Sequence, residues 1–185
     1  IPDTGDGVIT DDDRTTIGDG LPKCTGGFTN SFTYKNWDLS IFLQWSLGND
    51  ILNANRMVFE NPAKKKNTNM FASYAGRWTP ENSGSDMPRA NAVGSNEYSS
   101  LYVEDGSFLK LKTISLGYNF SAAMLKKAHI SSARVFVSAE NIATITGYSG
   151  SDPEVSTRSS VLTPGFDWSA YPRSFNASIG VNLTF

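Results

Sequence analysis

The last twelve residues of the chain alternate between apolar and polar positions without an exception. The apolar positions are every second residue from Phe175 to Phe185, and the polar or glycine positions are every second residue from Ser174 to Thr184. Because successive side chains of a β-strand point to opposite faces, this segment predicts a strand with one apolar and one polar face. A half-buried strand of a soluble sandwich and a strand in a membrane both show this pattern, so the rest of the chain has to decide.

Four further segments alternate in the same way, which predicts five strands in all. These segments are 10–14 residues long, which is long for a sandwich but suits a tilted strand that crosses a membrane. The first two are separated only by the neighbourhood of Asn36, which predicts a tight hairpin. The four segments are 26–35, 37–48, 107–120 and 133–142.

The connections between the expected strands alternate between short and long. A short turn joins the first two strands, whereas the connections over 49–105 and 143–171 are long. Outer-membrane barrels have this rhythm, with short periplasmic turns and long extracellular loops. The expected organisation is a Gly- and Asp-rich extracellular loop (1–25), a hairpin (26–48), a long extracellular loop (49–105), two strands (107–142), a second extracellular loop (143–171) and a closing strand (172–185).

Composition excludes several other classes of protein. A net charge of −2 gives no general affinity for nucleic acid. Cys24 is the single cysteine and His129 the single histidine, so a disulfide framework and a metal site built from these residues are excluded. No apolar run approaches the ~18 residues of a transmembrane helix. The chain starts inside what reads as a loop, and we expect the natural N-terminus to lie upstream.

The expected strand over 107–120 carries two lysines in an unfavourable place. Lys110 and Lys112 share their parity with Phe108 and Ile114, so strict alternation puts them on the apolar face. A lysine that faces lipid at the bilayer midplane costs about 2–4 kcal/mol. We expect both lysines to stand above the membrane on the extracellular side, and the alternative is a bulge near Thr113 that changes the face.

Four blocks of the sequence, in order, resemble the C-terminal part of SusC/RagA-type TonB-linked outer-membrane proteins, in the TonB-dependent receptor family. They begin with "GDGVITDDD", "SLYVEDGSF", "ARVFVSAEN" and "GFDWSAYPR", and they cover 5–56, 100–120, 133–155 and 165–185. The resemblance implies an all-β fold: a transmembrane barrel of about 22 antiparallel strands around an N-terminal plug, of which this chain supplies the last five strands and long extracellular loops.

The resemblance also implies a function and a set of partners. The expected function is TonB-dependent import of a nutrient (a glycan or oligosaccharide, or a peptide) across the cell outer membrane. The expected partners are a SusD-type surface lipoprotein, TonB (through a region outside this chain), the barrel-assembly machinery and the lipid bilayer, without nucleic acid. Two alternatives stay open: a siderophore or cobalamin receptor of the broader class, and a soluble calcium-stabilised β-sandwich that binds a ligand.

The closing strand has a specific role in such a barrel. The resemblance implies that it pairs with the first strand and that the terminal aromatic residue is a signal for barrel assembly. The polar face of this strand would line the lumen or touch the plug, and its apolar face would contact lipid. The residues assigned to closure and assembly are Phe175, Ile179, Val181, Leu183 and Phe185.

The acidic segment "PDTGDGVITDDD" is similar to a calcium-binding loop. With Gly7 at the position of the sharp turn, Asp6 and Asp13 take ligand positions, and Asp3 contributes if it is displaced by one residue. Pro2 and Thr4 stand where ligating residues are expected, so the motif departs from the full pattern. The alternative is an Asp- and Gly-rich turn whose carboxylates accept bonds from backbone amides. Calcium is therefore the one candidate cofactor.

Aromatic residues of the two long loops are candidates for contact with substrate or with the partner lipoprotein. Their rings could stack on sugar faces, or they could instead hold the loops together. Catalysis has no support: the acidic pairs Asp152/Glu154 and Glu104/Asp105 lack a positioned partner, and His129 alone builds no triad. We therefore expect that the protein is not an enzyme. The aromatic candidates are Trp78, Tyr148, Trp168 and Tyr171.

Overall fold

The computed structural model describes residues 14–61, 69–90, 98–126, 129–155, 157 and 162–185. The chain divides into two compact units, each built from three segments of the sequence. One unit, which we call the strand unit, comprises 22–48, 106–147 and 172–185. The other, which we call the loop unit, comprises 1–21, 49–105 and 148–171. Among the described residues, none of the helices is both long and apolar enough to cross a membrane.

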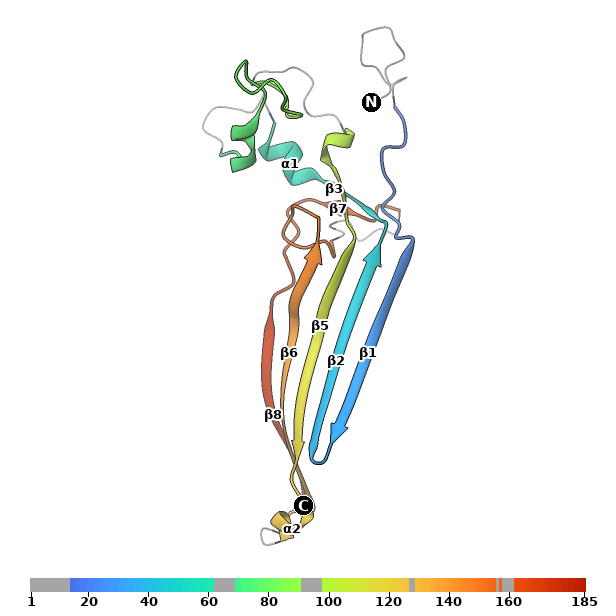
Figure 1. Ribbon diagram of the computed structural model, residues 1–185, viewed down its shortest axis with the longest axis vertical. Coiled ribbons are helices and arrows are strands. Elements are labelled where there is room, and N and C mark those ends of the chain that lie inside the picture. The colour runs from blue at the N-terminus through green and yellow to red at the C-terminus, as the bar shows by residue number, and fades with distance from the viewer. Residues whose placement is uncertain (1–13, 62–68, 91–97, 127–128, 156, 158–161) are drawn as a thin grey trace. The chain divides into compact units, whose positions relative to one another are not determined.

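The strand unit is a five-stranded antiparallel sheet, as the alternation predicts (Figure 1). Its strands follow one another in chain order, and each pairs with the next. A two-residue turn joins the first pair, and a link that contains the short helix α2 (Ala122–Leu125) precedes the fourth strand. The strands are β1 (Cys24–Tyr34), β2 (Trp37–Leu47), β5 (Phe108–Asn119), β6 (Ser132–Thr146) and β8 (Asn176–Thr184).

A bulge in β5 resolves the problem of the two lysines. Thr113 pairs with Phe42 and Leu111 pairs with Leu43, so Lys112 is an extra residue relative to β2. Because side chains alternate along a strand, one extra residue exchanges the faces of everything on its far side. Lys110 therefore lies on the polar face, where its side chain is only 2% exposed. We expected both lysines to stand above the membrane on an unbroken alternating strand; the register instead shows the alternative, a bulge next to Thr113 that changes the face of Lys110.

With this bulge, the register produces one apolar face that continues across all five strands. In β5 it contains Leu109 and Leu111 before the bulge and Ile114, Leu116 and Tyr118 after it. The even-numbered residues of β1 and the odd-numbered residues of β2 and β8 lie on the same apolar face. So do the odd-numbered residues of β6, apart from Asn141, whose φ is positive. No position of this face carries a charge in the strands that the structure describes.

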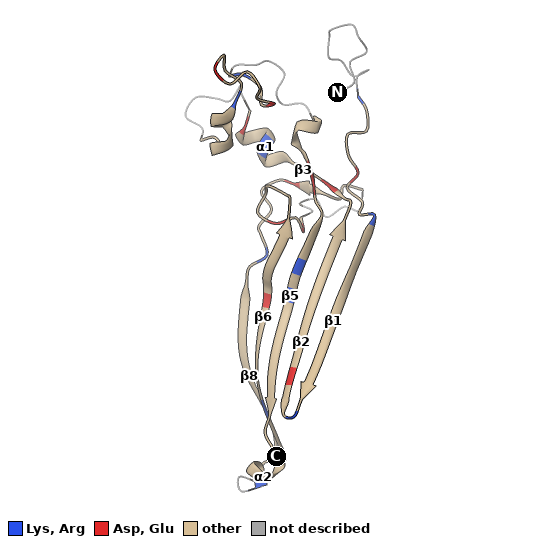
Figure 2. Cartoon of the chain, viewed as in Figure 1, with Lys and Arg blue, Asp and Glu red and all other residues tan. Residues whose placement is uncertain are grey.

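The opposite face is mainly polar. Its charged residues are Asp38, Lys110, Arg134 and Glu140, and Figure 2 shows how few charges interrupt the strands. Two of its phenylalanines lie over glycines of the neighbouring strand: a Cβ added at Gly180 would lie 2.4 Å from the ring of Phe136. A glycine at this place lets the aromatic ring lie flat on the sheet.

The loop unit has a small sheet of its own. The strand β3 (Asp50–Asn53) pairs antiparallel with β4 (Val103–Asp105) and parallel with β7 (Phe166–Asp167). The helix α1 (Ala54–Phe59) follows β3, and the 3₁₀ segments η2 (Ala72–Gly76) and η3 (Ser100–Tyr102) lie in the same unit. The β3–β7 pair joins the two long connections, which the sequence predicts only as separate loops. The loop unit has a small apolar core of three buried residues, Ala54, Met57 and Tyr102. Leu52, Leu101 and Phe166 pack against this core.

Candidate functional site

The apolar face of the strand unit remains exposed over most of its extent. Ile179 of β8 is 75% exposed, and Phe32, Leu116 and Val137 on the other strands are also exposed. A contiguous apolar surface of this kind marks a site of contact with lipid or with another protein. Because the exposed side chains occupy every strand of the sheet, the apolar face as a whole is the first candidate site.

The residues assigned to closure and assembly all lie exposed at or next to β8. Ile179, Val181 and Leu183 stand on the apolar face, while Phe175 and Phe185 flank the strand. Among the described strands, β8 pairs only with β6 and so has one open edge. An open edge of this kind can accept another strand, which barrel closure requires. The role of these residues in barrel closure stays a prediction.

The polar face holds an ion pair that spans three strands. Arg134 of β6 donates from Nη2 to Oδ2 of Asp38 on β2 (2.5 Å) and from Nε to Oδ1 (3.2 Å). Asn119 of β5 donates to the same Asp38 carboxylate (2.9 Å). The guanidinium passes over β5 at Gly117, where an added Cβ would lie 2.4 Å from Arg134 Nη2. This cluster connects β2, β5 and β6 through side chains on one face.

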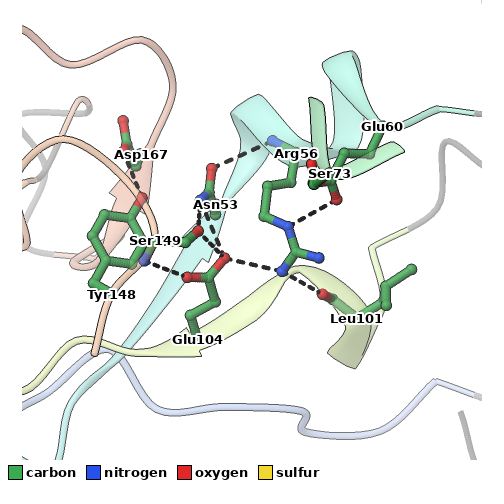
Figure 3. Close-up of polar contacts among 9 residues, drawn as sticks. All are labelled: Asn53, Arg56, Glu60, Ser73, Leu101, Glu104, Tyr148, Ser149 and Asp167. Atoms are coloured by element: carbon green, nitrogen blue, oxygen red, sulfur yellow. Dashed lines mark hydrogen bonds and ion pairs between the residues drawn. The ribbon is translucent and has the colours of Figure 1, made fainter. Parts of the chain in front are cut away.

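A second polar network, shown in Figure 3, holds the loop unit together. The carboxylate of Glu104 lies at its centre. Its Oε1 accepts from Arg56 Nη1 (3.0 Å), Ser149 Oγ (2.9 Å) and Asn53 Nδ2 (3.2 Å), and its Oε2 accepts from the backbone N–H of Ser149 (2.8 Å). Glu104 is on β4, Asn53 ends β3 and Arg56 is on α1, so one carboxylate connects the three elements to the segment that follows β6.

Arg56 extends this network toward η2. Its Nε donates to Glu60 (2.8 Å) and its Nη1 donates to the backbone carbonyl of Leu101 (3.2 Å). Ser73 of η2 donates to the other oxygen of Glu60 (2.5 Å). Burial by itself lowers the pKa of Arg56, but the two carboxylates outweigh it and raise the pKa above its usual value. The guanidinium is therefore a permanent charge that two segments of the loop unit share.

The pKa of Glu104 is shifted in the opposite direction, downward. Burial by itself raises the pKa of this carboxyl, but the hydrogen bonds from Ser149 and Arg56 outweigh it and hold the pKa below its usual value. Arg56 lies 48 residues from Glu104 in the chain, so the sequence did not indicate this pair. No local pattern signals such a pair.

Of the four aromatic candidates in the loops, Tyr148 is the buried one. It is 6% exposed, and its hydroxyl donates to Oδ2 of the buried Asp167 (2.5 Å). Burial, with the Asp167 carboxylate adding to it, raises the pKa of Tyr148 far above its usual range. The ring and hydroxyl are thus both used inside the loop unit, which favours the interpretation that Tyr148 holds the loops together.

The other three aromatic candidates are exposed. Trp168 lies parallel to Phe166 with ring centroids 6.4 Å apart, and Tyr171 is 90% exposed. Trp78 lines a surface pocket together with Asp86 and Arg89. These three side chains are available to a ligand or partner, and their role stays a prediction. The candidate calcium ligands Asp3, Asp6 and Asp13 lie outside the described residues, so that prediction rests on the sequence.

No protein-family model matches the chain, but curated proteins match it over nearly its whole length. TonB-dependent receptor P3 of Formosa agariphila is 37% identical over 98% of the chain and 18% of its own length. TonB-dependent receptor P26 of the same organism is 34% identical over 99% of the chain and 19% of its own length. TonB-dependent receptor SusC of Bacteroides thetaiotaomicron is 27% identical over 98% of the chain and 17% of its own length. The chain thus spans less than a fifth of the length of these relatives.

Solved structures agree with these relatives. The RagAB peptide importer in an "open-open" state superposes with a TM-score of 0.83 at 27% identity, over 100% of the chain and 20% of that structure's chain. The same importer in a "closed-closed" state gives a TM-score of 0.82 at 27% identity, over 96% of the chain and 19% of the other. Sequence and fold therefore agree that the chain belongs to the TonB-dependent receptors of the SusC/RagA type, which are proteins of the bacterial outer membrane.

Proposed function

We propose that the protein of which this chain is a segment imports a nutrient across the outer membrane, driven by TonB and assisted by a SusD-type surface lipoprotein. The chain's own part is barrel wall, barrel closure and loops. The observation that carries the proposal is the continuous, uncharged apolar face of the strand unit. The ion pair between Asp38 and Arg134 lies on the opposite, polar face. Transport needs no covalent chemistry, so no catalytic residue is assigned.

The two faces suit the two environments of a barrel wall. Apolar side chains facing lipid avoid the cost of about 2–4 kcal/mol that a lysine has at the bilayer midplane. The bulge at Lys112 serves this purpose, because it moves Lys110 to the polar face. Open strand edges are not tolerated in hydrocarbon, so the proposal requires that β1 and β8 pair with further strands of the complete receptor.

The loop unit supports the import function in a second way. The two connections that follow β2 and β6 along the chain form one folded body, held by the network around Glu104. We assign these connections to the extracellular side, where they contact the nutrient or the lipoprotein. A glycan or oligosaccharide is the proposed cargo, and a peptide is the alternative that the description of RagAB supports.

Paired lysine substitutions in the complete receptor test the wall assignment. Leu116 and its neighbour Ser115 occupy opposite faces of the central strand β5. Leu116→Lys puts a charge in lipid, so we expect a marked loss of the heat-modifiable, detergent-extracted form in outer membranes. Ser115→Lys puts the charge in the lumen, so we expect a level close to the unsubstituted receptor. Equal levels for the two variants, or a native protein that is soluble without detergent, would contradict the proposal.

The import function needs a separate experiment in the source organism. A strain that lacks the receptor should lose growth on one class of nutrient, and a plasmid copy should restore it. The same strain with Leu116→Lys should behave like the deletion, whereas Ser115→Lys should restore growth. Unchanged uptake of glycans, peptides, siderophores and cobalamin in the deletion strain would refute the import function.

A further inference from the structure

The loop unit contains a surface pocket to which neither the fold nor the family membership assigns a role. It has a volume of about 320 Å³ and is lined by Trp78, Ser85, Asp86, Met87, Pro88 and Arg89. This volume is at the lower end of the range of roughly 300–1,000 Å³ for ligand pockets, so the pocket suits one ring of a larger ligand.

The backbone around the pocket is held by its own hydrogen bonds. The backbone N–H of Trp78 donates to the carbonyl of Met87 (3.0 Å), which brings the two sides of the loop together. The side chains of Asn82 and Ser85 both donate to the carbonyl of Gly76 (2.8 and 2.7 Å). Ser85 Oγ also accepts from the backbone N–H of Met87 (3.1 Å). The indole of Trp78 therefore projects from a fixed frame, which lowers the entropic cost of binding.

The charged side chains of the pocket take no part in that frame. Across the residues that the structure describes, neither Asp86 nor Arg89 forms an ion pair or a side-chain hydrogen bond. Both side chains are exposed beside an indole that is 37% exposed. A carboxylate accepts hydrogen bonds and a guanidinium donates them, and both form stronger bonds than neutral groups. The pocket therefore offers one flat apolar ring, one strong acceptor and one strong donor.

From this geometry we propose that the pocket is a subsite for one pyranose ring of a neutral oligosaccharide. The apolar face of the sugar ring stacks on Trp78, the Asp86 carboxylate accepts from sugar hydroxyls, and the Arg89 guanidinium donates to a hydroxyl or ring oxygen. The opposite charges of Asp86 and Arg89 cancel, so the pocket favours a neutral ligand rich in both donors and acceptors. This inference rests on the proposed import function and specifies its cargo.

Binding to the complete receptor in detergent tests the subsite. The probes are maltohexaose, laminarihexaose and xylohexaose, with penta-alanine as the peptide, and the readout is isothermal titration calorimetry. We expect one of the sugars to bind, with Trp78→Ala weakening it about tenfold and Asp86→Asn weakening it several-fold. The matched controls are Tyr98→Ala and Glu81→Gln, an exposed aromatic and an exposed acid of the loop unit that do not line the pocket, and they should stay within about twofold.

The outcomes separate the subsite from the import function. Binding of none of the sugars, equal affinity in the Trp78→Ala and control variants, or binding of penta-alanine alone overturns the subsite. Each of these leaves the import function standing if the deletion strain still loses uptake of a nutrient. Circular dichroism and the heat-modifiable shift show whether each variant has folded, and Asp86→Asn, which keeps the shape of the side chain, provides the second test if Trp78→Ala does not assemble.

Discussion

The guanidinium of Arg134 reaches across β5 to the carboxylate of Asp38, with Gly117 beneath the contact. The pair joins two strands that do not hydrogen-bond to each other, because β5 lies between β2 and β6. Any side chain at position 117 would occupy the space that the guanidinium needs. The sheet therefore has a side-chain connection across three strands in addition to its backbone ladder.

Substitution of Gly117 by alanine should break this connection. The added Cβ would lie 2.4 Å from Arg134 Nη2 and 2.6 Å from Asp38 Oδ2, so the pair has to move apart. We expect the complete receptor to lose its heat-modifiable form at a lower temperature, as followed by gel migration after stepwise heating. Gly147→Ala is the matched control in the same unit, because nothing lies within 4 Å of its added Cβ. Equal transition temperatures for the two variants would show that the pair is dispensable.

Deletion of Lys112 should leave the two faces of β5 in place, and the receptor should still assemble. Without this residue, Leu111 and Thr113 become neighbours opposite Leu43 and Phe42, so alternation runs through β5 without a bulge. Lys110 then stays on the polar face and avoids the cost of about 2–4 kcal/mol of a lysine in lipid. Lys112→Ala keeps the bulge and should also assemble normally. The amount of receptor in purified outer membranes measures both variants, and loss of the deletion variant alone would mean that β5 needs the extra residue itself.

The loop unit should loosen in acid. Because the folded-state pKa of Glu104 lies below its usual value of about 4.5, the stabilisation from its ionised form is complete above that pH and is lost as the pH falls through the folded pKa. Between pH 7 and 5 we therefore expect no change. Hydrogen exchange at the Ser149 amide, which donates to Glu104, should accelerate below about pH 4 after correction for the intrinsic rate.

A variant separates this carboxylate from others in the same unit. Glu104→Gln keeps the shape of the side chain but removes the charge that Arg56 and Ser149 share, so protection at Ser149 should fall by about 1–3 kcal/mol at pH 7. Glu81→Gln alters an exposed carboxylate and should leave the protection at Ser149 unchanged. Protection that falls equally in both variants, or in neither, would remove Glu104 from the centre of the network.

Tyr148→Phe should destabilise the loop unit. The substitution keeps the buried ring but removes the donor to Asp167, which is 3% exposed. Among the residues that the structure describes, the carboxylate then keeps one bond, from the backbone N–H of Ala170 to its other oxygen. A buried group that loses a partner costs about 1–3 kcal/mol. Limited proteolysis of the receptor should therefore cleave the segment 148–171 faster. Tyr171→Phe changes a hydroxyl on an exposed ring and should cleave at the original rate, so similar rates for both would contradict the prediction.

The sequence by itself determined the strands, because a period of two is a local property that each segment carries without help from the others. The alternation from Phe175 to Phe185 predicts the two faces of β8, and the long connections after β2 and β6 predict where the loop unit arises in the chain. The order of the four blocks was sufficient to indicate the SusC/RagA family.

Only the tertiary structure decided which partner each strand and charge would meet. Lys112 looks like any other residue of an alternating strand, and only the register with β2 shows that it is an extra residue. Glu104 lies 48 residues from Arg56, and Asp38 lies 96 residues from Arg134, so each pair depends on how distant segments are brought together. Alternation is encoded within a strand, whereas bulges, parallel pairing and buried ion pairs depend on the opposing chain.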